Sequence, residues 1–303
     1  MNHSSLAPVS GITLPESTKS VVDEAIALWV HGKSVHTQRY YRRTAHQFLA
    51  WVGKPLERVT LADVQEYATT LETSGLAKSS QARAIASIKS LFTFIHKQLG
   101  ILRVNPAAPL AAPKSKDTLA ERILSEATVL LIINLETNLR NKALLKVLYV
   151  AGLRVSELTQ LTWRSLQSRD DGGQVLVYGK GGKTRAVKLP ASLWGELQLL
   201  RTNTEAKLDA PVFPSRKGKG NLTQVQVNRI VKRAAGRVPG IDREVAAKIS
   251  PHWLRHAHAT HAMDRGAPIH LVQATLGHSS VATTGRYLHA RPTDSSARFL
   301  PVV

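Results

Sequence analysis

Five short motifs in the second half of the 303-residue sequence carry side chains suited to chemistry on a phosphate ester. In chain order they read GLRVSEL, GKGGKTR, PHWLRHAHATH, LGH and TTGRYLHA. Arginines can grip the nonbridging oxygens of a phosphate with planar, permanently charged guanidinium groups. A tyrosine can attack phosphorus once the site removes its proton, and histidines can move that proton. The residue types are therefore those needed for covalent catalysis at a phosphodiester.

Each of these residues also has a structural explanation when it is taken alone. Arg154 could cap helix carbonyls or pair with Glu157, which lies one helical turn later. Lys180 and Lys183 stand between two apolar runs at a hairpin tip, where lysines are usually solvated. Tyr287 could be an ordinary half-buried helical tyrosine. Only the ordered set, and none of its members, carries a functional prediction.

The histidine-rich motif is the one candidate for a metal site. His252 and His256 are four residues apart and His258 and His261 three apart, so each pair can share a helix face. A zinc protease motif would need a glutamate in HExxH, and here WLR stands between the first two histidines. An arginine beside the ligands would repel a cation. We therefore expect no metal and no other cofactor.

Taken together in this order and with these gaps, the five motifs resemble the tyrosine recombinase, or phage-integrase, family, and most closely its Xer-like branch. The resemblance is specific over residues 120–290 and weaker over 19–105, which resembles the family's helical core-binding domain. It implies a site-specific DNA recombinase that cuts and rejoins strands through a 3′-phosphotyrosyl intermediate, without ATP. One departure is Gly285, two residues before the tyrosine, which should weaken the last helix.

The resemblance also assigns roles to particular residues. It implies that two arginines bind the phosphate and that a tyrosine is the nucleophile. A hairpin lysine is expected to protonate the leaving 5′ oxygen. Of two histidines, the first in the sequence is expected to accept a proton and the second to donate to the phosphate. Glu157 is expected to orient the first arginine rather than to take part in the chemistry. The catalytic set comprises Arg154, Lys180, His252, Arg255, His278 and Tyr287.

Further DNA contacts are expected in both parts of the chain. The first part resembles the groove-facing helices of the family's core-binding domain, although the same residues could form a solvated charged face. In the hairpin, the resemblance selects the first lysine for catalysis and leaves its neighbours to contact the DNA backbone. The expected contacts are Arg39, Arg42, Arg43, Lys78, Gln81, Arg83, Lys89, Lys183 and Arg185.

The charge of the chain agrees with a polyanionic partner. Lysine and arginine number 41 against 21 aspartate and glutamate, a net charge of +20, and most of the excess follows residue 112. Each basic side chain on a phosphate releases counterions, so double-stranded DNA is the expected partner. A membrane surface is the rival, but the sequence has no basic amphipathic helix, lipidation motif or long apolar run. The absence of cysteine and of a secretory signal favours the cytoplasm.

The elements that must position these residues are mainly helical. The expected fold is a helical, SAM-like core-binding domain plus a mixed α+β catalytic domain with a small β-sheet, arranged as a C-shaped DNA clamp. Ser34 and Ser79 are candidate helix N-caps, and Gly277 a candidate C-cap. A hairpin is expected from QVLVY and TRAVKLP around a glycine-rich turn. Helices are expected at about 19–32, 35–52, 60–74, 78–99, 125–136, 139–151, 191–203, 222–236, 252–265, 268–276 and 280–289.

Five segments organise the chain. A stretch rich in proline and small residues, NPAAPLAAPKSKD, marks the boundary between the two domains. The last segment, beginning polar and ending apolar, either frays or docks on a neighbouring protomer. The segments are a tail (1–18), the core-binding domain (19–104), a linker (105–120), the catalytic domain (121–290) and a C-terminal tail (291–303).

The family resemblance implies an assembly of two protomers on one inverted-repeat DNA site and of four in a synapse. Two other functions remain open at this point. A type IB topoisomerase shares the chemistry but relaxes DNA as a monomer, and a DNA-binding regulator would lack catalysis altogether. The compact GLRVSEL and HWLRHAHAT motifs favour recombination over the first, and the complete catalytic set argues against the second.

Overall fold

The fold is that of a computed structural model, which describes residues 16–113, 119–179, 184–201, 207–215 and 220–287. The chain divides into two compact units, Met1–Lys116 and Asp117–Val303. Both units are mainly helical and the second contains a three-stranded sheet, which confirms the expected mainly helical fold with a small β-sheet. Within the described part of the chain, none of the helices has the length and apolar character needed to cross a bilayer.

The first unit packs its helices around an aromatic centre. Phe48 lies against Tyr67 and Phe92 with ring centroids 5.0 and 5.7 Å apart, both in edge-to-face geometry. All three rings are almost fully buried. The four helices lie within three residues of their expected ends: α1 (Glu16–Val30), α2 (Val35–Val52), α3 (Leu61–Thr73) and α4 (Lys78–Lys97).

One of the two expected N-caps of this unit is right and the other is wrong. The Ser34 hydroxyl accepts from the Thr37 amide at the start of α2. At the start of α4 the cap residue is Ala77, which makes no side-chain hydrogen bond. Its carbonyl already accepts from the amides of Ser80 and Gln81, at 2.8 and 3.0 Å. Ser79 therefore lies inside the helix and cannot cap it.

The chain after α4 stays on the first unit. Leu102 and Ala107 are buried in the same apolar core as the helices. Asn105 donates to the Thr93 hydroxyl, and the Lys89 ammonium donates to the Leu110 carbonyl at 2.5 Å. The first residues of the proline-rich stretch thus add to the core of this unit.

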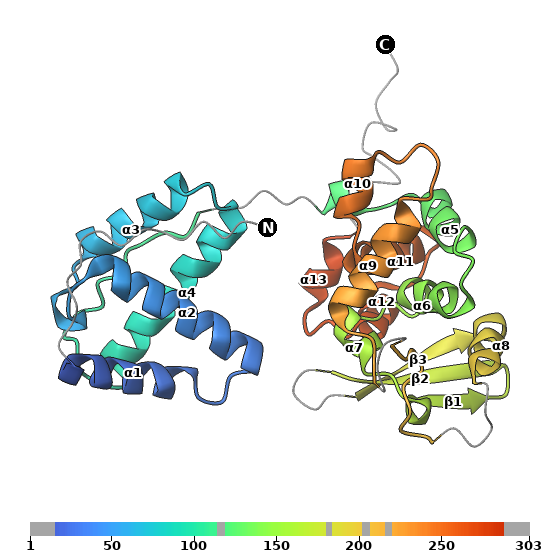
Figure 1. The fold of residues 1–303 in the computed structure, drawn as a ribbon, viewed down its shortest axis with the longest axis horizontal. Coiled ribbons are helices and arrows are strands. Elements are labelled where there is room, and N and C mark those ends of the chain that lie inside the picture. The colour runs from blue at the N-terminus through green and yellow to red at the C-terminus, as the bar shows by residue number, and fades with distance from the viewer. Residues whose placement is uncertain (1–15, 114–118, 180–183, 202–206, 216–219, 288–303) are drawn as a thin grey trace, which may run out of the picture. The chain divides into compact units, whose positions relative to one another are not determined.

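The second unit combines a helical core with a sheet at one end (Figure 1). Short 3₁₀ turns stand at Ala120–Arg122 and Trp163–Ser165. Its helices are α5 (Glu126–Asn134), α6 (Leu139–Val150), α7 (Val155–Thr159), α8 (Ala191–Leu200), α9 (Gln224–Ala235), α10 (Arg243–Lys248), α11 (Pro251–Asp264), α12 (Ile269–Leu276) and α13 (Val281–Gly285).

The sheet is antiparallel in the order β1 (Leu166–Arg169), β2 (Gly172–Tyr178) and β3 (Thr184–Pro190). The expected hairpin is confirmed, with Val175 opposite Val187, and both side chains are buried. Strand β1 was not expected, because LQSR has no buried apolar alternation by which to recognise it. Helix α10 was missed for a similar reason, since it is six residues long and mostly exposed.

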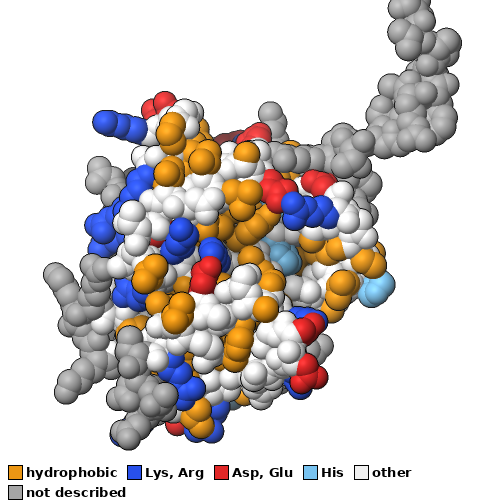
Figure 2. Space-filling view, turned by 90° about the vertical axis from the view of Figure 1, so that its right-hand side faces the viewer, with side chains coloured by type: hydrophobic (Ala, Val, Ile, Leu, Met, Phe, Trp, Pro, Cys, Tyr) orange, Lys and Arg blue, Asp and Glu red, His pale blue; other side chains and the backbone are white. Residues whose placement is uncertain are grey.

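One face of the second unit mixes apolar and charged side chains (Figure 2). Both basic and acidic side chains occur on this face, so the excess positive charge of the chain does not make the face uniformly positive. The unit also exposes large apolar side chains, including Leu139 and Leu199, at 74% and 82%.

Candidate active site

Helix α11 brings His252 and Arg255 of the PHWLRHAHATH motif to one region of the second unit. Pro251 occupies the first turn, where a missing amide costs no helical hydrogen bond. His252 is exposed at this end, whereas Arg255, nearly one turn later, is 3% exposed. A buried arginine needs fixed acceptors, because an unpaired charge away from water is costly.

Arg255 finds these acceptors on backbone carbonyls. Its Nη1 and Nη2 donate to Gly152 O at 2.5 Å and Leu276 O at 2.6 Å. Burial, and next the charge of Arg154, lowers the pKa of Arg255 to about 10. The guanidinium remains a cation at neutral pH, and it presents a fixed positive charge on the inner side of the site.

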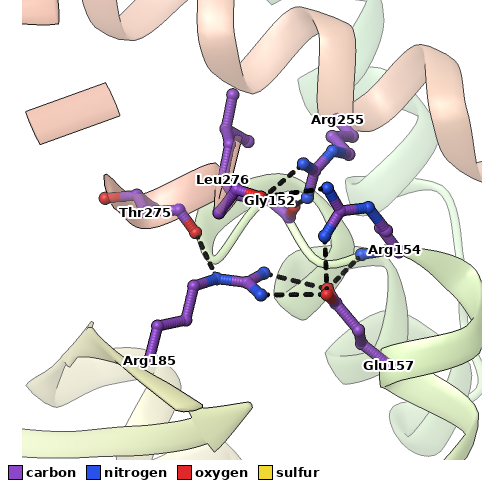
Figure 3. A network of polar contacts seen from close by, with 8 residues as sticks. Gly152, Arg154, Glu157, Arg185, Arg255, Thr275 and Leu276 are labelled. Atoms are coloured by element: carbon purple, nitrogen blue, oxygen red, sulfur yellow. Dashed lines mark hydrogen bonds and ion pairs between the residues drawn. The ribbon is translucent and has the colours of Figure 1, made fainter. Parts of the chain in front are cut away.

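Arg154 lies at the start of α7 and shares a carboxylate with a second arginine (Figure 3). Its Nη1 donates to Glu157 Oε1 at 2.9 Å, and its backbone amide donates to Oε2 at 2.8 Å. Arg185, on β3, grips both oxygens of Glu157 at 2.9 Å. Burial raises the pKa of Glu157, but hydrogen bonds from Arg185 and the Arg154 amide outweigh it and lower the pKa overall. The carboxylate is therefore ionised at neutral pH and orients both arginines.

Tyr287 lies just beyond α13 with its hydroxyl in a hydrogen bond. The residue is 6% exposed, and its hydroxyl is 2.7 Å from His256 Nδ1. Burial raises the pKa of the tyrosine, against the opposing charges of Arg255 and Arg286. His256 was not predicted as a site residue. Its spacing of four from His252 on one helix was the only sequence signal that pointed to it.

The low pKa of His256 leaves its imidazole unprotonated and at the same time makes it a weak base. Burial, and next the neighbouring His252, lowers this pKa to about 4, so the imidazole is neutral at pH 7. The pKa of His252 is itself lowered by partial desolvation and by the charges of Arg255 and Arg154. The two histidine rings lie 6.2 Å apart.

His278 also lies beside the ring of Tyr287. Its ring is nearly parallel to the tyrosine ring, at 8° with centroids 6.4 Å apart, and its Nδ1 is 2.9 Å from Thr284 Oγ1. It follows Gly277, which ends α12 with φ 65°, as the sequence predicted. Burial, and next the charge of Arg255, lowers the pKa of His278 to about 4. The ring is neutral at pH 7 and can donate one N–H.

These side chains enclose one pocket of about 240 Å³. Among the described residues that line it are three arginines, three histidines and the tyrosine, without a carboxylate. Positive charge and neutral imidazoles around a cavity suit a singly charged phosphodiester. The structure thus gathers five of the six residues expected to be catalytic, while Lys180 lies outside the described residues. The lining is Leu119, Arg154, His252, Arg255, His256, His278, Thr283, Arg286 and Tyr287.

The other two histidines of the motif have structural partners. His258 Nδ1 is 2.8 Å from the Tyr149 carbonyl, and His261 is bonded to the Tyr149 hydroxyl and the Leu124 carbonyl. Burial lowers the pKa of His258 to about 4. Within the described residues, no group of three potential ligands could hold a metal ion.

The expected DNA contacts of the first unit fall into two groups. Arg39, Arg42, Arg43, Lys78 and Arg83 are exposed, and two of these arginines lie over the ring of Tyr40. The other two have internal hydrogen bonds.

The expected DNA contact of Gln81 is wrong, because this residue is 4% exposed and its amide donates to the Leu76 carbonyl. Lys89 is half-buried, and its ammonium is bonded to the chain after α4. In the second unit, Arg185 is likewise held inside by Glu157. Lys183 lies outside the described residues.

Two family models match the chain. The phage integrase family matches residues 121–294, and the N-terminal SAM-like domain of phage integrase matches residues 22–99. Among curated relatives, the tyrosine recombinase XerD of Vibrio cholerae serotype O1 is 36% identical over 272 residues, 85% of this chain and 87% of the relative. The tyrosine recombinase XerC of Xanthomonas axonopodis pv. citri is 34% identical over 276 residues, 84% of this chain and 87% of the relative.

Solved structures agree in fold. The XerH site-specific recombinase bound to its difH substrate has a TM-score of 0.66 at 23% identity, covering 92% of this chain and 82% of that one. A lambda integrase dimer bound to a COC′ core site has a TM-score of 0.70 at 18% identity, covering 93% and 97%. The chain therefore belongs to the phage integrase family, as an Xer-like tyrosine recombinase, an enzyme of site-specific DNA recombination.

Proposed function

We propose that Tyr287 is the nucleophile of this recombinase and that it forms a 3′-phosphotyrosyl link to one DNA strand. The observation that supports this role is the position of its hydroxyl. It lies beside the pocket lined by Arg154 and Arg255, and it has a neutral imidazole 2.7 Å away. A buried tyrosine with a raised pKa needs such a partner, because its proton must leave during the attack.

Of the pocket arginines, Arg154 and Arg255 stabilise the charge that develops on the nonbridging oxygens. Arg255 is held by two backbone carbonyls, and Arg154 by Glu157. Donors fixed in this way need no reorganisation when the oxygens gain charge. Such electrostatic stabilisation of the transition state is the largest single contribution to catalysis at many sites of this kind. His278 adds a neutral donor beside the tyrosine ring.

The proton balance of the cleavage step has two ends. The bond from the Tyr287 oxygen to phosphorus forms, and the bond from phosphorus to the 5′ oxygen breaks. His256, with His252 one turn away, accepts the phenolic proton. The leaving 5′ oxygen takes a proton, which the family resemblance assigns to Lys180, outside the described residues. In the reverse step a free 5′ hydroxyl attacks the phosphotyrosine, so rejoining needs no ATP.

Each active site cuts one strand, so exchange of strands between two duplexes needs four tyrosines. We therefore propose two protomers on each inverted-repeat site and four in the synapse. A monomer that only relaxes supercoils would need one tyrosine. A plasmid that carries two target sites separates the two functions, because recombination yields new circles and relaxation alone does not.

The test of the nucleophile also finds the target. The protein is incubated with a pool of nicked duplexes of random sequence, and SDS-resistant adducts are isolated, sequenced and mapped by peptide mass spectrometry. We expect the adduct on Tyr287 and none with Tyr287→Phe, which should still bind the selected DNA. Tyr149→Phe is the matched control, because that tyrosine contacts His261 and not the pocket. An adduct that survives in Tyr287→Phe, or that maps to Tyr149 or Tyr178, contradicts the proposal.

A further inference from the structure

The C-terminal end of α12 presents three successive backbone carbonyls to three arginines. Such carbonyls have no helical partners, and together they carry the negative end of the helix dipole. Gly277, which ends the helix in a left-handed conformation, turns the last carbonyl toward the pocket side. The three bonds run from Arg185 Nε to Thr275 O at 2.7 Å, from Arg255 Nη2 to Leu276 O at 2.6 Å and from Arg154 Nη2 to Gly277 O at 3.2 Å.

Arg185 differs from the other two because all its nitrogens are occupied by protein acceptors (Figure 3). Its side chain is 13% exposed, against 36% for Arg154. Arg185 does not line the pocket that contains Tyr287, but it lines a neighbouring pocket of about 720 Å³ that Arg154 and His278 also line. A guanidinium held in this way is poorly placed to bind a DNA phosphate, so the expected backbone contact of Arg185 gives way to an internal role.

That internal role concerns the charge of Glu157. The carboxylate is 6% exposed and accepts from Arg154 and Arg185 together. With both arginines in place its negative charge is divided between them. Without Arg185, the whole charge would fall on Arg154 and would compete with the substrate phosphate for the same guanidinium.

We propose that Arg185 is a positioning residue for DNA cleavage, which acts by holding Glu157 and the end of α12 so that the guanidinium of Arg154 is directed into the pocket and is available to the substrate phosphate. The proposal rests on the proposed function, because it assigns the residue to the same cleavage step. It also explains why a strand of the sheet, helix α7 and the end of α12 meet at one guanidinium.

The experiment is a double-mutant cycle of Arg185→Met and Glu157→Gln, with three measurements on each full-length variant. These are DNA binding, the single-turnover rate of adduct formation on saturated DNA, and thermal unfolding. We expect Arg185→Met to slow adduct formation by roughly 10- to 100-fold, less than loss of a direct transition-state donor, while binding changes little. Adding Glu157→Gln should restore much of the rate, because it removes the unbalanced charge.

A matched control is available on the surface of the same unit. Arg164 makes the same forked contact with Asp209, at 2.8 and 3.1 Å, but both side chains are largely exposed and outside the pocket. Arg164→Met and Asp209→Asn should leave adduct formation unchanged, alone and together. If Arg185→Met does not fold, the cycle is run with Arg185→Lys, which keeps the charge but cannot fork across the carboxylate.

Three results would overturn the proposal. The first is wild-type adduct formation by the Arg185 variant. The second is a loss of DNA binding that matches the loss of rate, which would make Arg185 a DNA contact. The third is a double variant as slow as the product of the single effects, which would mean a general loss of packing. Failure of the proposed function is separate, since the wild-type protein would then form no adduct on Tyr287.

Discussion

The arginine side and the tyrosine side of the pocket are held in very different ways. Arg255 donates to the carbonyl of Gly152, which is buried between two residues of the main core, and to that of Leu276, in the small apolar cluster that also contains Tyr287. Tyr287 stands two residues beyond α13, a helix of five residues that ends at Gly285. Among the described residues its hydroxyl has one hydrogen bond, to His256, and its ring is buried in the small apolar cluster. Hydrogen bonds to the backbone therefore fix the charge on one side, whereas apolar packing and one hydrogen bond hold the nucleophile on the other.

The difference follows from what each side must do. Stabilising charge works best when the donors are in place before the reaction, so that nothing reorganises during it. A nucleophile must exchange its hydrogen bond for a bond to phosphorus, and a strong cage would oppose that exchange. We infer that rigidity of the arginines and freedom of the tyrosine are both required, and the variants below test each side in turn.

The largest effect is expected on the arginine side. Arg154→Lys and Arg255→Lys keep a positive charge but lose the planar fork, so each should slow adduct formation by about 10²- to 10³-fold. Binding should change little, because many other phosphate contacts remain. The measurement is the single-turnover rate on saturated DNA. An unchanged rate in either variant would mean that this arginine does not stabilise the charge that develops during cleavage.

The next effect is expected at the hydrogen bond of the tyrosine hydroxyl. His256→Asn keeps an acceptor near the position of Nδ1 but cannot take up a proton, whereas His256→Leu removes both. If His256 accepts the phenolic proton, both variants should slow adduct formation by roughly 10²-fold. A nearly normal rate with asparagine alone would reduce His256 to a holder of the hydroxyl. His252→Asn is the control, and a larger loss there would move the proton acceptor to His252.

A smaller effect is expected on stability. Because the folded pKa of His258 is about 4 and the ordinary value is 6.5, the unfolded chain binds the proton first. The free energy of unfolding should therefore fall as pH drops from about 6.5 to about 4, by at most about 1.4 kcal/mol per unit from this group. His258→Asn can still donate to the Tyr149 carbonyl and should flatten that slope. Denaturant unfolding at several pH values measures it, and an unchanged slope would refute the assignment.

The smallest effect is expected from Gly285→Ala. A Cβ at this position meets no atom within 4 Å, and its φ is not in the left-handed region. Alanine should stabilise the end of α13 by about 0.5–1 kcal/mol. If the tyrosine side needs its freedom, adduct formation should slow a few-fold while the melting temperature rises. A faster reaction would mean that freedom of the chain before Tyr287 slows adduct formation and is not required for it.

Sequence alone predicted what depends on local patterns. Helix α2 has the bounds that were expected, and Gly277 ends α12 as its position after an apolar run suggested. Strand β1 and helix α10 were missed because they are short and lack buried periodicity. Periodicity reports a buried face, and elements without one leave no such signal.

Sequence alone missed those site residues whose hydrogen-bond partners lie far away along the chain. His256 was not singled out because its partner, Tyr287, is 31 positions later. Arg185 was expected at the DNA because the hairpin is basic, and only the structure brings it to Glu157 and Thr275, 28 and 90 positions away. Motif order predicts which residues take part, but pairings across the fold decide which of them touch.

Gly152 contributes both to the packing of the second unit and to the position of Arg255. A methyl group there would come within 2.8 Å of the Leu276 side chain and 2.9 Å of the His258 ring, and φ of +59° already favours glycine. Its carbonyl is the acceptor that holds Arg255. Selection for activity should therefore tolerate no other residue at this position. In a library of functional variants, position 152 should stay invariant even where its neighbours drift.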